Sequence, residues 1–446
     1  MTARRFAIVV CAVCAACGDN SPAGAELVTA VSGTRLAVQK YRYDDGTELA
    51  VGNELYDTEL HARCRAQRWI DDTVRCVPVV DEAVYSDAAC TELVGLGRTV
   101  DKPTLFLAYD HRAGATIAAR LFRADVQRAA ISQSYAMVDG ACTGPMPVSL
   151  DGTNFYEIGD ELDGSALMAL RDGELGDGRL AVQLREADDG LRLPFGVVDR
   201  TLGAACAPRF QSDGGMACEP LDAPPAVYFS DPGCSVPAIA VGATVPAIAS
   251  VVEPSGCARY YRVGHEVSPP VYRRDGAACT AVTAVVGRVF SVDAPLELPA
   301  LARSPEAVRG HRLQRVILEH DGLRFLDDRL LDTATGVPCS PRTLGDDTRC
   351  LPTSVASIGL FTDACTTAVR AAELPRPICE PIAFATTNRP FQLHDLTDPP
   401  PGPLFRRDLD GCRLYTGSVG TELRGLGPPL DLTTFVGGVY FGERSP

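Results

Sequence analysis

Two histidine–acid pairs are the residues of this sequence whose types and spacing come nearest to a chemical site. His265 precedes Glu266 and His394 precedes Asp395, at similar places in two related parts of the chain. Imidazole and carboxylate groups bind divalent metals and polar ligands, so convergence of the two pairs would create a small ligand-binding site. Both pairs also lie near proline-containing turns, where such residues are commonly solvated loop side chains. The sequence leaves both interpretations open.

The familiar catalytic motifs are absent. None of the six histidines belongs to an H-E-x-x-H motif, and the chain has no G-x-S-x-G nucleophile turn and no phosphate-binding glycine loop. Catalytic triads can still assemble from distant residues, so this absence does not exclude an enzyme. We therefore predict no particular catalytic residue, no metal and no cofactor, and we favour a non-enzymatic function.

One tryptophan and three recurring aspartates have two interpretations each. Trp69 is a candidate sugar platform, although Phe210 in a related segment favours packing in a hairpin. The aspartates suggest either calcium ligands or turn caps; they are Asp57, Asp199 and Asp332. Calcium needs six or more oxygen ligands, whereas an isolated aspartate commonly caps a turn through hydrogen bonds to nearby backbone. Turn capping is the favoured interpretation.

The chain contains three copies of one pattern. Each copy starts with Arg-Leu, reaches Asp-Gly about ten residues later, continues to a Cys-x-Pro motif and then to an aromatic residue, an aspartate and a further cysteine. Such self-similarity is typical of repeat architectures. The division that follows is a signal peptide over 1–16, a lipid-anchored tether over 17–32, and β repeats over 33–177, 178–309 and 310–446.

Three pairs of cysteines are symmetrically placed about turn residues. Their separations are 12, 12 and 11 residues; the pairs are Cys64 with Cys76, Cys206 with Cys218, and Cys339 with Cys350. Cysteines equidistant from a turn face each other across a hairpin, at a distance that a disulfide can span. We predict these three disulfides. The pairing of the other eight cysteines of the mature chain is left open.

The local pattern predicts an all-β protein. Alternating or β-branched segments are separated by Asp-Gly and similar turn signals, and only residues 364–374 have a helical pattern. Each repeat divides into two halves with about four strands each, which suggests a six-bladed β-propeller closed by residues 435–442. The alternative is three tandem β-sandwich or barrel domains of ordinary size.

The N-terminus resembles an export signal. Arg4 and Arg5 precede an apolar run that is too short to span a bilayer and that ends at Cys17, as in a bacterial lipobox. Cys11 and Cys14 would leave with the signal and Cys17 would be lipidated, so 14 of the 17 cysteines would remain. An even number in an oxidising compartment favours disulfides, and the lack of a C-x-x-C pair in the mature chain weakens the zinc alternative.

The net charge of −15 makes nucleic acid an improbable partner, and the only predicted membrane contact is through the lipid anchor. The lipobox-like start and the cysteine-bearing repeats resemble uncharacterised bacterial lipoproteins built from β repeats. This resemblance implies a location in the cell envelope, at the outer membrane and facing either the periplasm or the surface. The predicted function is a binding or scaffold module for an envelope protein or glycan. The alternative is a periplasmic or surface hydrolase or lyase on a propeller scaffold.

Overall fold

The computed structural model describes most of the chain between Glu26 and Gly442. The described residues are 26–69, 71–97, 103–111, 117–149, 152–252, 257–275, 278–362, 364–375, 379, 382–388, 390–408, 411–417 and 421–442. The predicted signal peptide and Cys17, the predicted lipidation residue, lie outside these ranges.

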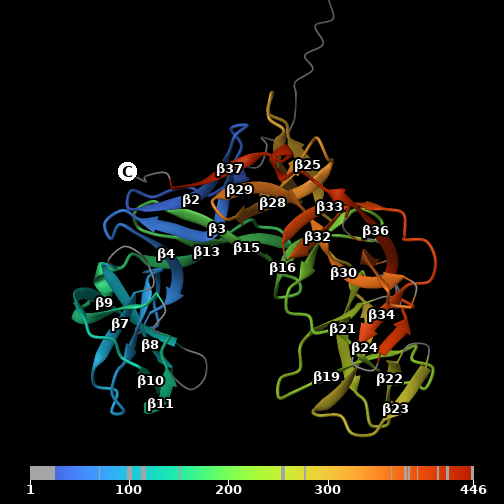
Figure 1. Cartoon of the computed structure of the whole chain (residues 1–446), viewed down its shortest axis with the longest axis horizontal. Coiled ribbons are helices and arrows are strands. Elements are labelled where there is room, and N and C mark those ends of the chain that lie inside the picture. Colours follow the sequence, from blue (N-terminus) through green and yellow to red (C-terminus); the bar gives the residue numbers. More distant parts are fainter. Residues whose placement is uncertain are drawn as a thin grey trace, which may run out of the picture.

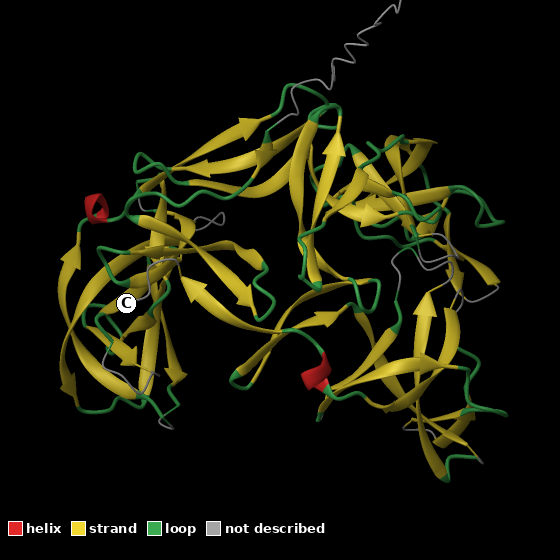
Figure 2. Ribbon diagram, turned by 90° about the horizontal axis from the view of Figure 1, so that it is seen from above, coloured by secondary structure: helices red, strands yellow, loops and turns green. Residues whose placement is uncertain are grey.

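Strands make up almost all of the regular structure (Figure 2). In the described part of the chain there is no α-helix, and two short 3-10 helices occur, η1 (Gly164–Ala166) and η2 (Leu432–Thr434). The helical prediction for residues 364–374 is wrong. Most of this segment forms β31 (Thr367–Pro375), whose backbone pairs with strands on both sides, so sheet pairing overrides its weak helical pattern.

The first half of each repeat is a four-stranded antiparallel meander. The first meander is β2 (Leu36–Tyr43), β3 (Glu48–Asp57), β4 (Ala62–Arg68) and β5 (Val74–Pro78). The second is β14 (Leu180–Glu186), β15 (Arg192–Asp199), β16 (Ala204–Phe210) and β17 (Met216–Pro220). The third is β26 (Leu313–His320), β27 (Leu323–Asp332), β28 (Val337–Leu344) and β29 (Asp347–Pro352).

Three linking strands join the meanders into a ring. Each link pairs first with the last strand of one meander and then with the first strand of the next; the links are β13 (Ala169–Leu175), β25 (Ala302–Glu306) and β37 (Gly437–Gly442). For β25 the first pairing is made just upstream, by a bridge between Ala300 and Ala217. The C-terminal β37 lies between β29 and β2, and so closes the ring.

The second half of each repeat is a separate seven-stranded sheet. The first comprises β6 (Asp81–Tyr85), β7 (Leu93–Gly97), β8 (Leu105–His111), β9 (Ile117–Arg128), β10 (Gln133–Val138), β11 (Ala141–Pro147) and β12 (Asn154–Leu162). The second comprises β18 (Tyr228–Phe229), β19 (Pro237–Val241), β20 (Ile248–Val252), β21 (Ala258–Glu266), β22 (Val271–Asp275), β23 (Ala278–Val282) and β24 (Arg288–Pro295). The third comprises β30 (Ser354–Thr362), β31, β32 (Phe384–Asn388), β33 (Phe391–Thr397), β34 (Phe405–Asp408), β35 (Gly411–Leu414) and β36 (Thr421–Pro429).

Five strands of the first and third of these sheets close into small barrels. The order β6-β7-β12-β9-β8 returns to β6, and β30-β31-β36-β33-β32 returns to β30, each through a parallel pairing. The second sheet has the corresponding order, and a bridge between Pro225 and Ser250 joins its ends. We call the three sheets the first, second and third barrels. In each, the remaining two strands form a hairpin beside the barrel.

Figure 1 shows the meanders and linking strands together at the top, with the first barrel below on one side and the other two on the opposite side. The described sheets therefore do not form the six four-stranded blades of a propeller. They fit the alternative of tandem β domains, each contributing one meander to a shared ring and one barrel outside it. A first half of four strands agrees with the sequence pattern, but a second half of seven does not.

Seven disulfides link the described cysteines. The last hairpin of each meander has one disulfide, with 5.3 Å between the two Cα atoms. These three disulfides are the ones that the spacing predicts: Cys64–Cys76, Cys206–Cys218 and Cys339–Cys350. Their strand register differs from the prediction, because each bond joins diagonal neighbours: Cys64 lies opposite Pro78, and Cys76 opposite Ala66. The twist of a two-stranded hairpin brings such diagonal side chains together.

The shorter spacing in the third repeat comes from its turn. Leu344 pairs with Asp347, which leaves a two-residue turn at Gly345 and Asp346, whereas the turn after Phe210 is longer and returns at Met216. The offset between the bonded cysteines is the same in all three hairpins. Between the equivalent pairs, Thr343–Thr348 and Phe210–Met216, the third hairpin has four residues and the second has five, which gives a cysteine separation of 11 in place of 12.

The remaining disulfides belong to the barrels. Cys90–Cys142, Cys234–Cys279 and Cys365–Cys412 hold the projecting hairpin of each barrel against the loop before its second strand. Cys257–Cys379 has no counterpart in the first repeat and joins the second barrel to the third. Seven disulfides indicate an oxidising, extracytoplasmic compartment.

Candidate functional site

The two histidine–acid pairs lie at corresponding places in different barrels. His265 is exposed on β21, with its Nδ1 3.1 Å from the Ser291 hydroxyl, and Glu266 pairs with Arg288 at 2.6 Å. His394 on β33 is buried, with its Nδ1 2.9 Å from the Gly427 carbonyl oxygen. Within the described ranges, no hydrogen bond or ion pair joins one pair to the other, and no group of three or more potential metal ligands occurs. The structure does not bring these four residues into one site.

Trp69 lies in the interior. Its side chain is 3% exposed and packs with Leu105, Leu107, Leu121 and Leu167, where the first meander contacts the first barrel. A sugar platform needs an exposed ring face, so the packing interpretation is the correct one.

The three recurring aspartates each cap a turn and hold a buried ion pair. The Oδ1 atom of Asp57 accepts hydrogen bonds from the backbone N–H groups of Glu59 and Leu60, at 3.0 and 3.2 Å. All three carboxylates are buried and pair with the arginine that opens the same repeat; the pairs are Arg35–Asp57, Arg179–Asp199 and Arg312–Asp332. The Arg-Leu signature in the sequence marks these arginines, but pattern alone does not reveal their partners.

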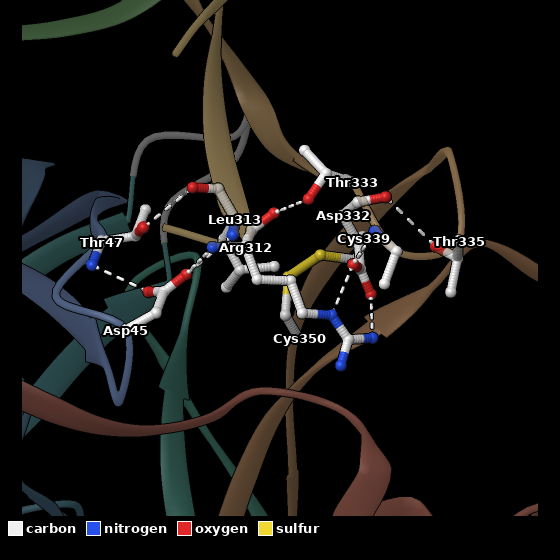
Figure 3. Close-up of a disulfide and its surroundings, with 10 residues drawn as sticks. Asp45, Thr47, Arg312, Leu313, Asp332, Thr333, Thr335, Cys339 and Cys350 are labelled. Atoms are coloured by element: carbon white, nitrogen blue, oxygen red, sulfur yellow. Dashed lines mark hydrogen bonds and ion pairs between the residues drawn. A yellow bond between two sulfur atoms is a disulfide. The ribbon is translucent and has the colours of Figure 1, made fainter. Parts of the chain in front are cut away.

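Figure 3 shows this arrangement in the third repeat. Arg312 donates from Nε and Nη2 to the two oxygens of Asp332, at 2.7 and 2.6 Å, and from Nη1 to the Thr434 carbonyl at 2.6 Å. Because Thr434 ends η2, shortly before β37, the hydrogen bond from Arg312 joins the start of a repeat to its end. Arg35 and Arg179 make the corresponding contacts with the carbonyls of Ala166 and Glu297.

Carboxylates also join neighbouring repeats. Asp45 Oδ2 accepts from the backbone N–H groups of Arg312 and Leu313, at 2.9 and 2.7 Å, as Figure 3 shows. Asp189 makes the same contact with the start of the first repeat. The third junction is different: β1 (Leu27–Val28) pairs with β27, and Val28 packs in the core between the second and third meanders.

A cleft of about 660 Å³ lies beside the first barrel. Its walls come from β4, β6, β8 and the β10–β11 hairpin, and it contains three tyrosines, Tyr85, Tyr109 and Tyr135. Tyr85 lies directly opposite Tyr135 in an antiparallel pair and is 8% exposed, whereas Tyr109 and Tyr135 are half-buried. The lining of the cleft thus contains one buried and two half-buried tyrosines.

Polar side chains complete the lining of this cleft. Gln67 and Arg68 extend from β4, and Glu82 from β6. Burial, with a smaller contribution from the Glu82 charge, raises the pKa of the Tyr109 hydroxyl above its usual value. Tyr109 therefore stays protonated and can donate or accept a hydrogen bond. The site combines flat apolar faces with donors and acceptors, as ligand pockets commonly do.

One position beside the cleft breaks the repeat. In the second and third barrels an arginine covers the aromatic ring that corresponds to Tyr85: Arg274 lies 5.1 Å from the Phe229 ring centre, and Arg407 lies 5.0 Å from that of Phe361. Each of these arginines lies opposite the hairpin cysteine of its barrel. In the first barrel, the residue opposite that cysteine, Cys142, is Met137. Sequence reasoning missed this cleft. Aligning the three copies on Cys142, Cys279 and Cys412 exposes the change from arginine to methionine and is the signal that could have found it.

A second cavity, of about 320 Å³, lies where the first and third meanders meet under Thr29 and Ala30. Asp327 on its wall is almost fully buried, and its Oδ2 atom has no hydrogen-bond partner. Burial raises the pKa of Asp327 from 3.8 to about 6, against the attraction of Arg329. Ionising this carboxyl group therefore costs stability.

We expect Asp327→Asn to stabilise the protein at pH 7.5 by on the order of 2 kcal/mol, and to have little effect at pH 4. The pKa of the Asp327 carboxyl group is higher in the folded protein than in the unfolded chain. Its contribution to the free energy of unfolding is therefore complete below pH 3.8 and is lost as the pH rises through about 6. Urea unfolding of both proteins, followed by circular dichroism at the two pH values, measures the difference. An equal difference in the free energy of unfolding at both pH values would contradict a raised pKa for Asp327.

The comparison with protein families gives one match. A model described as a family of unknown function, DUF7481, matches residues 9–435. The chain belongs to the DUF7481 family. The match covers the three meanders and the three barrels of this DUF7481 chain and ends just before β37, and the family description supplies no activity. No curated protein and no solved structure matches the chain. In the described residues, no helix is long and apolar enough to cross a membrane.

Proposed function

We propose that this DUF7481 chain is a non-enzymatic binding module of the cell envelope, for a protein or a glycan. The cleft beside the first barrel carries this proposal. Its lining comes from five strands, and two disulfides brace two of them: Cys64–Cys76 holds β4, and Cys90–Cys142 holds β11. A site on such a braced scaffold is pre-organised, which lowers the entropic cost of binding.

The lining of the cleft favours binding over hydrolysis. Glu82 is the one carboxylate among the described residues that line it, and no histidine lines it. Most glycosidases need two carboxyl groups on either side of the scissile bond, and a serine hydrolase needs a base beside its nucleophile. The alternative of a hydrolase or lyase therefore has less support at this cleft than a binding function.

A lipid anchor at Cys17 completes the proposal, with the protein at the outer membrane. Its support is the lipobox-like sequence, together with the oxidising compartment that the disulfides indicate. Fatty-acid labelling that persists in Cys17→Ser would contradict the anchor.

Photo-crosslinking in living cells tests the binding function. A photoreactive amino acid in place of Met146, which is 43% exposed at the cleft, is expected to capture one reproducible ligand. Leu414 is the control, because it is an apolar residue, 59% exposed, on the corresponding hairpin of the third barrel. Adducts that are identical at both positions, or absent at Met146, would contradict a binding role for the cleft.

A further inference from the structure

We propose that the cleft beside the first barrel binds a neutral carbohydrate, with a pyranose ring stacked on Tyr109 or Tyr135. This inference rests on the proposed binding function and names its ligand. Its starting point is the coincidence of partly exposed tyrosine rings and planar polar side chains in one cleft.

The aromatic faces supply the apolar half of the recognition. A pyranose ring presents C–H groups on its flat faces, and these pack favourably on the electron-rich face of an aromatic ring. Tyr109 and Tyr135 are half-buried, so each ring is held in place and still has an accessible surface. Ala83 and Ala108 also line the cleft, and their small side chains take up little of its space.

The polar half comes from Gln67, Arg68 and Glu82. Their amide, guanidinium and carboxylate groups together supply donors and acceptors, and sugar hydroxyls are both donors and acceptors. Arg68 forms only a weak ion pair, because its guanidinium lies 3.8 Å from the Asp72 carboxylate and both side chains are exposed. Such a surface pair contributes little stability, so Arg68 can turn toward a ligand at small cost.

Charge and size select among carbohydrates. The charges of Arg68 and Glu82 offset each other in the cleft, and the chain as a whole has a net charge of −15, so the protein disfavours polyanionic glycans. A volume of about 660 Å³ lies within the range of roughly 300–1,000 Å³ that is typical of small-ligand sites. The cleft therefore suits a short segment of a neutral glycan.

Titration calorimetry with the purified, oxidised protein tests this inference. The probes are neutral cello-, chito-, malto-, xylo- and manno-oligosaccharides, with hyaluronan and dextran sulfate as polyanions. We expect at least one neutral oligosaccharide to bind and the polyanions not to bind. Tyr109→Ala and Tyr135→Ala are each expected to weaken binding at least tenfold, whereas Tyr109→Phe keeps the ring and should weaken it less than threefold.

Tyr272→Ala is the matched control, because Tyr272 lies opposite Phe229 as Tyr135 lies opposite Tyr85. It should leave binding unchanged. Circular dichroism verifies folding, and Gln67→Ala replaces any tyrosine variant that fails to fold, with the same direction of effect expected. An equal loss in Tyr272→Ala would overturn the inference.

The crosslinking at Met146 separates failure of this inference from failure of the proposed function. If no oligosaccharide binds but Met146 captures a protein that Leu414 does not, the carbohydrate inference is overturned and the binding function stands. If no oligosaccharide binds and Met146 captures nothing, both are overturned.

Discussion

Replacing Arg312 with alanine is expected to lower the free energy of unfolding by about 3 kcal/mol. The change leaves the Asp332 carboxylate, whose side chain is 2% exposed, without its charged partner. It also removes the hydrogen bond from Arg312 to the carbonyl of Thr434, the last residue of η2, which precedes the strand that closes the ring. Urea unfolding followed by circular dichroism measures the loss.

Two further variants separate the buried charge from other effects. Arg312→Ala combined with Asp332→Asn removes the unpaired charge and should recover more than about 1 kcal/mol of the loss. Arg200→Ala breaks an ion pair with Glu174 in which both side chains are well exposed, and should cost less than about 1 kcal/mol. Equal losses for Arg200→Ala and Arg312→Ala would show that the buried ion pair has no special role.

Removing the disulfide of the third meander is expected to cost about 3 kcal/mol. The double substitution of Cys339 and Cys350 by alanine opens a short loop in the unfolded chain. The unfolded state then gains conformational entropy, which lowers the free energy of unfolding. Both cysteines are fully buried, so the lost packing adds to the effect. Comparing the unfolding free energies of the double variant and the oxidised wild type measures the cost.

The three repeats provide an internal check on this prediction. Cys64–Cys76 and Cys206–Cys218 have the same Cα separation and the same diagonal register, so their removal should have effects similar to that of Cys339–Cys350. Losses below about 1 kcal/mol at all three hairpins would contradict a stabilising role for these bonds.

The hairpins could be predicted because their determinants are local. Turn residues and the cysteines on either side of them lie within a dozen positions, and alternation of apolar residues defines the strands. The diagonal register could not be predicted, because it depends on hairpin twist. The aspartate turn caps are local as well, and the sequence analysis interpreted Asp57, Asp199 and Asp332 correctly as caps.

The architecture could not be predicted, because it depends on pairings between distant segments. The local pattern of β37 does not specify both of its neighbours, β29 and β2, which are far from it in sequence. The propeller prediction assumed that every half-repeat forms its own four-stranded sheet. Linking strands shared between meanders, and projecting hairpins beside barrels, have no separate local signature.

The tyrosine cleft and the disulfide between barrels escaped prediction for the same reason. Tyr85, Tyr109 and Tyr135 are spread over 51 positions, and none lies in a motif with known chemistry. Cys257 and Cys379 are 122 residues apart, and no turn relates them. In contrast, the histidine–acid pairs were conspicuous in the sequence, but the fold places them in separate barrels.

Mapping the disulfides of the secreted, unreduced protein by proteolysis and mass spectrometry tests the architecture most directly. We expect one cross-linked peptide pair within each meander, one within each barrel, and a pair that joins Cys257 to Cys379. Cys64 bonded to any partner other than Cys76, or free thiols at Cys257 and Cys379, would contradict this architecture, in which three disulfide-bonded meanders form a ring and the barrels lie outside it.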